Sequence, residues 1–180
     1  MNLTESEYTA LRHTIASRGT ARISLLPVTI IGWGLVAGTL TVLGNNPATS
    51  LFPLAVLAGG FEAIHAMHVG VERIGRYLQV FYEGTADGPL WETTAMSIGP
   101  ALPGGGVDPL FTMVFAFATL LNLIPAIVPS PTRLELFVIA LMHVAFLVRL
   151  VRARGAATRQ RAVDLESYRV VKLKMSNGRE

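Results

Sequence analysis

Long apolar segments alternate with shorter polar ones along this chain. Four segments are apolar over roughly the 20 residues that a helix needs to cross a bilayer. They cover residues 23–43, 51–71, 109–128 and 134–151. The pattern therefore predicts an all-α integral membrane protein whose four transmembrane helices form a bundle.

The polar residues 1–22 precede the first apolar segment. Thr4 and Glu7 have the spacing of a capping box, in which the two side chains satisfy the amino end of a helix. Apolar residues then recur on one helical face, namely Tyr8, Leu11 and Ile15. We expect an amphipathic cytoplasmic helix that ends near Gly19.

Residues 83–108 lie between the second and third segments and are rich in glycine and proline. They predict a cytoplasmic loop with one short helix over 90–98, in which Trp91 suits the headgroup layer. The tail, residues 152–180, is basic and continues the fourth helix for a few turns. Within the tail, the alternation over 168–175 indicates a short extended segment or a partner-binding strip.

Composition agrees with this class: 51% of residues are hydrophobic and only 15% are charged, against about 25% in soluble domains. The sole full charge between Ile23 and Val71 is Glu62. Such segregation excludes a disordered chain and a disulfide-rich secreted module. The absence of cysteine excludes thiolate metal sites and cysteine nucleophiles.

The basic residues predict the orientation. With both termini cytoplasmic, every one of the 15 Lys and Arg residues except Arg133 lies inside, as the positive-inside rule requires. Arginine greatly outnumbers lysine, which is typical of a GC-rich bacterial gene, so we expect a multi-pass protein of the bacterial inner membrane. The net charge of +3 then indicates attraction to anionic lipid headgroups and not nucleic-acid binding.

The second apolar segment carries a polar seam that continues past the membrane. At about 100° per residue its members share one stripe of a helix that we expect over 53–82. They are Glu62, His65, His68, Glu72, Arg76, Gln79 and Glu83. Beyond the membrane, the seam is either a solvated face or a face buried by another protomer.

Small residues mark two faces where helices can approach closely. The first segment has Gly34 and Gly38, spaced four apart. The second has a longer series, namely Ala55, Gly59, Ala63, Ala66 and Gly70. Both faces predict tight helix packing, either within the bundle or between protomers.

Glu62 lies near the middle of its segment, where an ionisable residue is costly and marks a functional candidate. The rise of about 1.5 Å per residue places His65, His143 and Asn122 at similar depths, so we expect an interior polar cluster of these four residues. Three interpretations of this cluster remain open. It is a proton or ion pathway, a buried hydrogen-bonded network, or a ligand set in which His68 joins Glu62, His65 and His143.

The ligand set has two versions. A metal site would use Glu62 with the three histidines, but di-metal carboxylate bundles need a second Glu-x-x-His pair that this chain lacks. A haem would need His65 or His68 to face His143. We predict no cofactor, and haem or a divalent metal stands as the alternative.

No nucleophile–base arrangement points to an enzyme. We expect a helix-packed subunit of a membrane complex that contacts lipids and either copies of itself or other membrane subunits. The more specific version of this hypothesis is a homo-oligomeric channel or transport assembly lined by the seam. The alternative is a membrane redox or metal protein that uses His65, His68 and His143.

Overall fold

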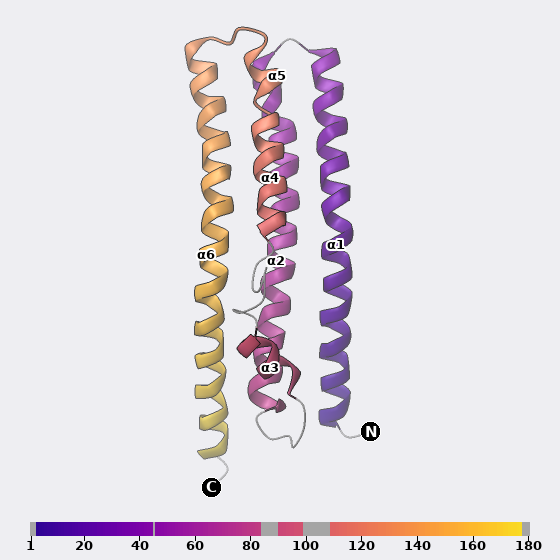
Figure 1. Ribbon diagram of the computed structural model, residues 1–180, viewed down its shortest axis with the longest axis vertical. Helices are drawn as coiled ribbons and strands as arrows, with labels where there is room; N and C mark the ends of the chain where they lie inside the picture. The colour runs from indigo at the N-terminus through magenta and orange to yellow at the C-terminus, as the bar shows by residue number, and fades with distance from the viewer. Residues whose placement is uncertain (1–2, 45, 84–89, 99–108, 178–180) are drawn as a thin grey trace. The chain divides into compact units, whose positions relative to one another are not determined.

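The computed structural model describes residues 3–44, 46–83, 90–98 and 109–177, and no strand occurs among them. Figure 1 shows the helices in chain order. Their bounds are α1 Leu3–Leu43, η1 Pro47–Ser50, α2 Leu51–Phe81, α3 Trp91–Ile98, α4 Pro109–Leu121, α5 Ile124–Ile127 and α6 Arg133–Asn177. The prediction of an all-helical protein is therefore confirmed for this part of the chain.

Three of the helical stretches are long and apolar enough to cross a membrane. They lie within Glu5–Leu43, Pro47–Phe81 and Arg133–Asn177. A shorter apolar stretch covers Phe111–Ile127 and contains α4 and α5. Length and composition thus mark the chain as a membrane protein.

The chain divides into two compact units, which we describe separately. The apolar unit comprises Arg22–His65 and Pro109–Ala153. Its core is a cluster of buried aliphatic and aromatic side chains centred on α2, α4 and α6. The ring of Phe61 meets those of Phe115 and Phe146 edge-on, at centroid distances of 5.4 and 6.0 Å, a geometry that aromatic pairs prefer.

The polar unit comprises Met1–Ala21, Ala66–Asp108 and Arg154–Glu180. Side-chain contacts join its helices: the ring of Tyr77 on α2 meets that of Tyr168 on α6 edge-on at 5.7 Å. Nζ of Lys172 donates to the carbonyl of Val80 at 2.6 Å. Figure 1 shows α3 beside the carboxyl end of α2.

The third apolar segment is not one helix over 109–128. It breaks after Leu121 and resumes as α5 at Ile124. Proline at 125 has no N–H to donate to the carbonyl four residues earlier, so the α-helical ladder is interrupted at this point. The break turns Asn122 into the interior, where only 1% of its surface is exposed.

Two other expectations need correction. α1 does not end near Gly19 but continues to Leu43, since one glycine inside a helix costs only about 1 kcal/mol. Residues 168–175 are not extended, because α6 continues to Asn177. Tyr168 and Lys172, four residues apart on α6, both contact α2. The single helix expected over 53–82 and the short helix over 90–98 are confirmed by α2 and α3.

Most of the glycine- and proline-rich loop, residues 84–89 and 99–108, lies outside the described residues.

Candidate functional site

A buried hydrogen-bond network centres on Asn122 in the apolar unit. Its Oδ1 accepts from the indole Nε1 of Trp33 at 3.1 Å. Its Nδ2 donates to the carbonyl of Ser50 at 2.8 Å and lies 3.1 Å from Nε2 of His143. One amide thus joins α1, η1 and α6, and the helix break after Leu121 places it there.

His143 has both ring nitrogens engaged. Nδ1 lies 2.7 Å from the carbonyl oxygen of Ile139, which only accepts, so Nδ1 carries the proton. Nε2 then accepts from the Asn122 amide, and the ring is neutral with one tautomer fixed. For His143 to bind a metal or haem iron through Nε2, the bond from Asn122 would have to break.

Glu62 lies in a different group of contacts in the same unit. Its Oε2 accepts from Nη2 of Arg149 on α6 at 2.8 Å. Cζ of Arg149 also lies 5.9 Å from the centroid of the Phe61 ring, over its face. The ring of His65 is parallel to that of Phe61 with a centroid distance of 5.8 Å.

The four residues expected in one interior cluster therefore make their contacts in two groups. Asn122 and His143 come together in the buried network, whereas Glu62 and His65 flank Phe61 and Arg149. In the part of the chain that the structure describes, no three His, Asp or Glu side chains gather as ligands for a metal ion.

The Glu62–Arg149 ion pair is half-exposed. The side chains of Glu62 and Arg149 have 48% and 40% of their surface accessible. Beside the pair on α2, Gly59 and Ala63 are also exposed, and no atom lies within 4 Å of where a Cβ of Gly59 would be. The pair and the small residues thus form an open surface on α2, which we call the α2 face: Ala55, Gly59, Glu62 and Ala63 with Arg149 beside them.

The other small residues have different surroundings. Gly34 and Gly38 on α1 have nothing within 4 Å of a Cβ position. In the polar unit, Ala66 is exposed, whereas a Cβ on Gly70 would lie 2.6 Å from Nη1 of Arg18. Only part of the predicted series on α2 is therefore free of contacts within its own unit.

The seam in the polar unit is covered by α6. Oε2 of Glu72 accepts from Nη2 of Arg76 and from Nε of Arg161, each at 2.9 Å. Arg76 is buried, and its Nη1 lies 3.4 Å from Oε1 of Gln79. His68 lines a cavity of about 10 Å³ beside Glu72 and Arg161, which has room for about one water molecule.

Glu83 ends the seam and caps α3. Its carboxylate accepts from the backbone N–H groups of Glu92 and Thr93 at 2.7 and 2.8 Å. Glu92 in turn pairs with Arg12 at 2.9 Å. Burial raises the pKa of Glu92 above its usual range, while the charge of Arg12 opposes that shift. These contacts fasten α3 to α1 and α2.

Glu7 does not serve its own helix as a capping-box residue. Its two carboxylate oxygens accept from the hydroxyls of Tyr77 and Tyr82 at 2.9 and 2.6 Å. Burial, followed by the hydrogen bond to Glu7, raises the pKa of Tyr82 well above its usual range. The amino end of α1 is thereby bound to the carboxyl end of α2.

Sequence reasoning missed several partners. Trp33 and Ser50 bind Asn122, Arg149 binds Glu62, and Arg161 binds Glu72. Arg149 is the one with a visible signal, since it lies in the last turn of an apolar segment and a long side chain there can extend toward the carboxylate of Glu62. No sequence pattern predicts the partners of Trp33, Ser50 and Arg161.

Neither a protein family, nor a curated protein, nor a solved structure matches this chain.

Proposed function

We propose that this chain is a non-enzymatic subunit of a membrane complex, which assembles by packing its α2 face against a second copy of itself. In this arrangement α4 and α5 supply the fourth crossing of the bilayer, and both termini lie on the cytoplasmic side. The orientation rests on the positive-inside rule, and the excess of arginine over lysine favours the inner membrane of a bacterium.

The observation that carries this proposal is the half-exposed ion pair between Glu62 and Arg149. Glu62 lies about 16 Å along α2 from Leu51, which is close to the middle of a hydrocarbon core about 30 Å thick. Charged groups at that depth are costly when they face lipid. A second protein surface over the pair removes that contact.

The neighbouring residues favour a helix as the covering element. Gly59 and Ala63 have no bulky side chain, so the backbone of a second helix can approach α2 closely. An isologous dimer places the same patch on both subunits. Glu62 of one protomer then meets Arg149 of the other, and the charges on the two patches are complementary.

The neutrality of the pair favours assembly over conduction. A carboxylate that is bound to a guanidinium at 2.8 Å is less available to carry protons or cations than a free one. A conducting oligomer would therefore have to break the pair first. Ion flux through liposomes containing the protein is expected to be no greater than through empty liposomes.

Cross-linking tests the association directly, because the chain contains no cysteine. A single cysteine from Ala63→Cys is expected to form disulfide-linked dimers in membranes under mild oxidation. Val28→Cys on α1 provides an exposed control position away from the α2 face. Equal cross-linking at both positions would show that the contacts are random collisions.

Charge reversal tests the role of the pair. In the Ala63→Cys background, Glu62→Arg and Arg149→Glu should each reduce cross-linking about tenfold, because each patch becomes self-repelling. Co-expression of the two variants should restore cross-linking between differently tagged copies, since the patches then carry opposite charges. Circular dichroism checks folding, and Glu62→Gln serves as the milder variant. Wild-type cross-linking in every variant would overturn the proposal.

A further inference from the structure

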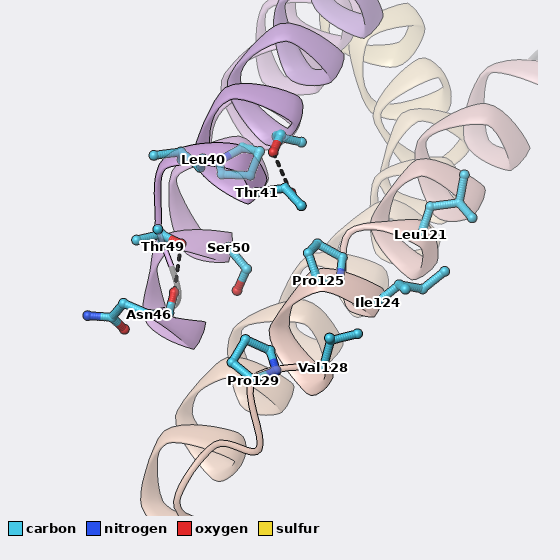
Figure 2. Close-up of a pocket in the computed structure, with 13 residues that line it drawn as sticks. Leu40, Thr41, Asn46, Thr49, Ser50, Leu121, Ile124, Pro125, Val128 and Pro129 are labelled. Atoms are coloured by element: carbon cyan, nitrogen blue, oxygen red, sulfur yellow. Dashed lines mark hydrogen bonds between the residues drawn. The ribbon is translucent and has the colours of Figure 1, made fainter.

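The apolar unit contains a pocket outside the α2 face, and this pocket shares Ser50 with the buried network. It has a volume of about 420 Å³, within the range of about 300–1,000 Å³ that small-molecule sites occupy. Figure 2 shows Leu40 and Thr41 of α1 with Thr49 and Ser50 of η1 on one side, opposite residues of α4 and α5. The opposite wall consists of Leu121, Ile124, Pro125, Val128 and Pro129.

The hydroxyl groups that line this pocket are already bound to the backbone. Thr41 donates to the carbonyl of Ala37 at 2.8 Å, and Thr49 donates to that of Asn46 at 2.7 Å. Ser50 donates to the carbonyl of Pro47 at 2.8 Å. The wall therefore presents mainly hydrocarbon, which suits an apolar guest and offers little to a charged or sugar-like one.

Prolines fix the shape of the pocket. Pro53 lines it from the first turn of α2, and Pro125 and Pro129 line it from α5 and the residues that follow. The φ angle of each proline is fixed by its ring. The pocket is thus largely formed before a guest binds, which lowers the entropy lost on binding.

The position of the pocket indicates where the guest comes from. It lies where α1 ends and α2 begins, at one boundary of the apolar segments. Ile124 and Val128 line the pocket and are also exposed large apolar residues. They connect the pocket to the outer surface of the unit, which faces lipid in a membrane.

We infer that this pocket binds one acyl chain of a membrane phospholipid, with the headgroup outside near Asn46. The volume, the apolar wall with its satisfied hydroxyls, and the apolar path from the outer surface all fit this guest. The site is independent of the dimer proposed above.

Native mass spectrometry of the detergent-purified full chain tests this site. Dioleoyl phosphatidylglycerol is added, and the fraction of protein that keeps one lipid is measured. Ala37→Trp fills the pocket and is expected to weaken binding at least tenfold. The matched control is Val42→Trp, at a position that is 84% exposed and does not line the pocket, and it should bind lipid as the wild type does.

The outcomes separate the alternatives. If Ala37→Trp does not fold, Ala37→Leu fills less of the pocket and should give a smaller but clear loss. Unchanged binding in a folded pocket-filling variant, or equal loss in Val42→Trp, would overturn the assignment. Tighter binding of free oleate than of the phospholipid would contradict the proposed source. Cross-linking through Ala63→Cys should persist in Ala37→Trp, so the lipid site and the dimer can fail separately.

Discussion

The amide of Asn122 donates a hydrogen bond to the ring of His143, whose tautomer is set by the carbonyl of Ile139. The amide nitrogen of Asn122 lies 3.1 Å from Nε2 of His143, and Nδ1 of His143 lies 2.7 Å from the carbonyl of Ile139. A residue at a helix break thus contacts the unprotonated ring nitrogen of a residue on α6, and both side chains are only 1% exposed. The same amide also holds Trp33 and Ser50, so the break joins three separate parts of the apolar unit.

Replacing Asn122 by leucine should destabilise the protein by about 2–4 kcal/mol, because buried polar groups on three neighbours lose their partner. The thermal unfolding midpoint in detergent measures this loss. His143→Leu removes one of the polar groups that Asn122→Leu leaves without a hydrogen-bond partner. The double variant should therefore be more stable than the sum of the two single effects predicts, and strict additivity would show that the two side chains do not interact.

Adjacent glycines on α2 should respond differently to alanine. A Cβ on Gly60 would overlap the buried side chain of Thr29, whereas a Cβ on Gly59 meets nothing within 4 Å. Gly60→Ala should therefore cost about 1–3 kcal/mol of stability. In the detergent-solubilised monomer, where no second copy covers the α2 face, Gly59→Ala should be neutral or stabilising by up to about 1 kcal/mol. Thermal unfolding compares the two. Thr29→Ala should relieve part of the cost of Gly60→Ala, and no relief would argue against this contact.

Removal of the Glu83 carboxylate should loosen α3. Glu83→Ala takes away the acceptor for the N–H groups of Glu92 and Thr93, a cap typically worth about 0.5–2 kcal/mol. Amide hydrogen exchange over residues 91–98 should accelerate about 3- to 30-fold. Glu166→Ala, at an exposed position on α6, is the control and should leave this exchange unchanged.

Glu7 should control the ionisation of Tyr82. The folded pKa of Tyr82 is raised, so its contribution to stability is present below about pH 10, the usual pKa of tyrosine, and is lost as the pH rises through the folded pKa. Glu7→Gln removes the negative charge beside the hydroxyl. The tyrosinate absorbance at 295 nm should then begin to rise at lower pH. Tyr82→Phe should reduce this difference between Glu7→Gln and wild type to the part that comes from Tyr77, whose hydroxyl also donates to Glu7.

The sequence predicted the helices better than their interruptions. Runs of apolar residues located the long helices, because a bilayer or a core demands them. Pro125 was visible in the third run, but the turn at Asn122 was not. That turn depends on Trp33, Ser50 and His143, which lie far from Asn122 in the sequence.

The contacts of the polar residues were likewise predicted only in part. The rise per residue along the helices predicted that His143 and Asn122 lie at the same depth, and the two side chains are in contact. The same calculation also placed Glu62 with them. Glu62 instead binds Arg149, since a long guanidinium side chain reaches a carboxylate several ångströms from its own Cα. The period of the tail near Tyr168 suggested an extended strip, but contacts with Tyr77 and Val80 favour a helix.

The pairing of Glu62 with Arg149 also bears on how the protein responds to the transmembrane potential. An elementary charge that crosses a membrane potential of 100 mV changes in energy by about 2.3 kcal/mol. The paired side chains carry no net charge, so the field exerts no net force on them. Loss of Arg149 would leave the carboxylate uncompensated, and the stability of the apolar unit would then depend on the voltage across the membrane.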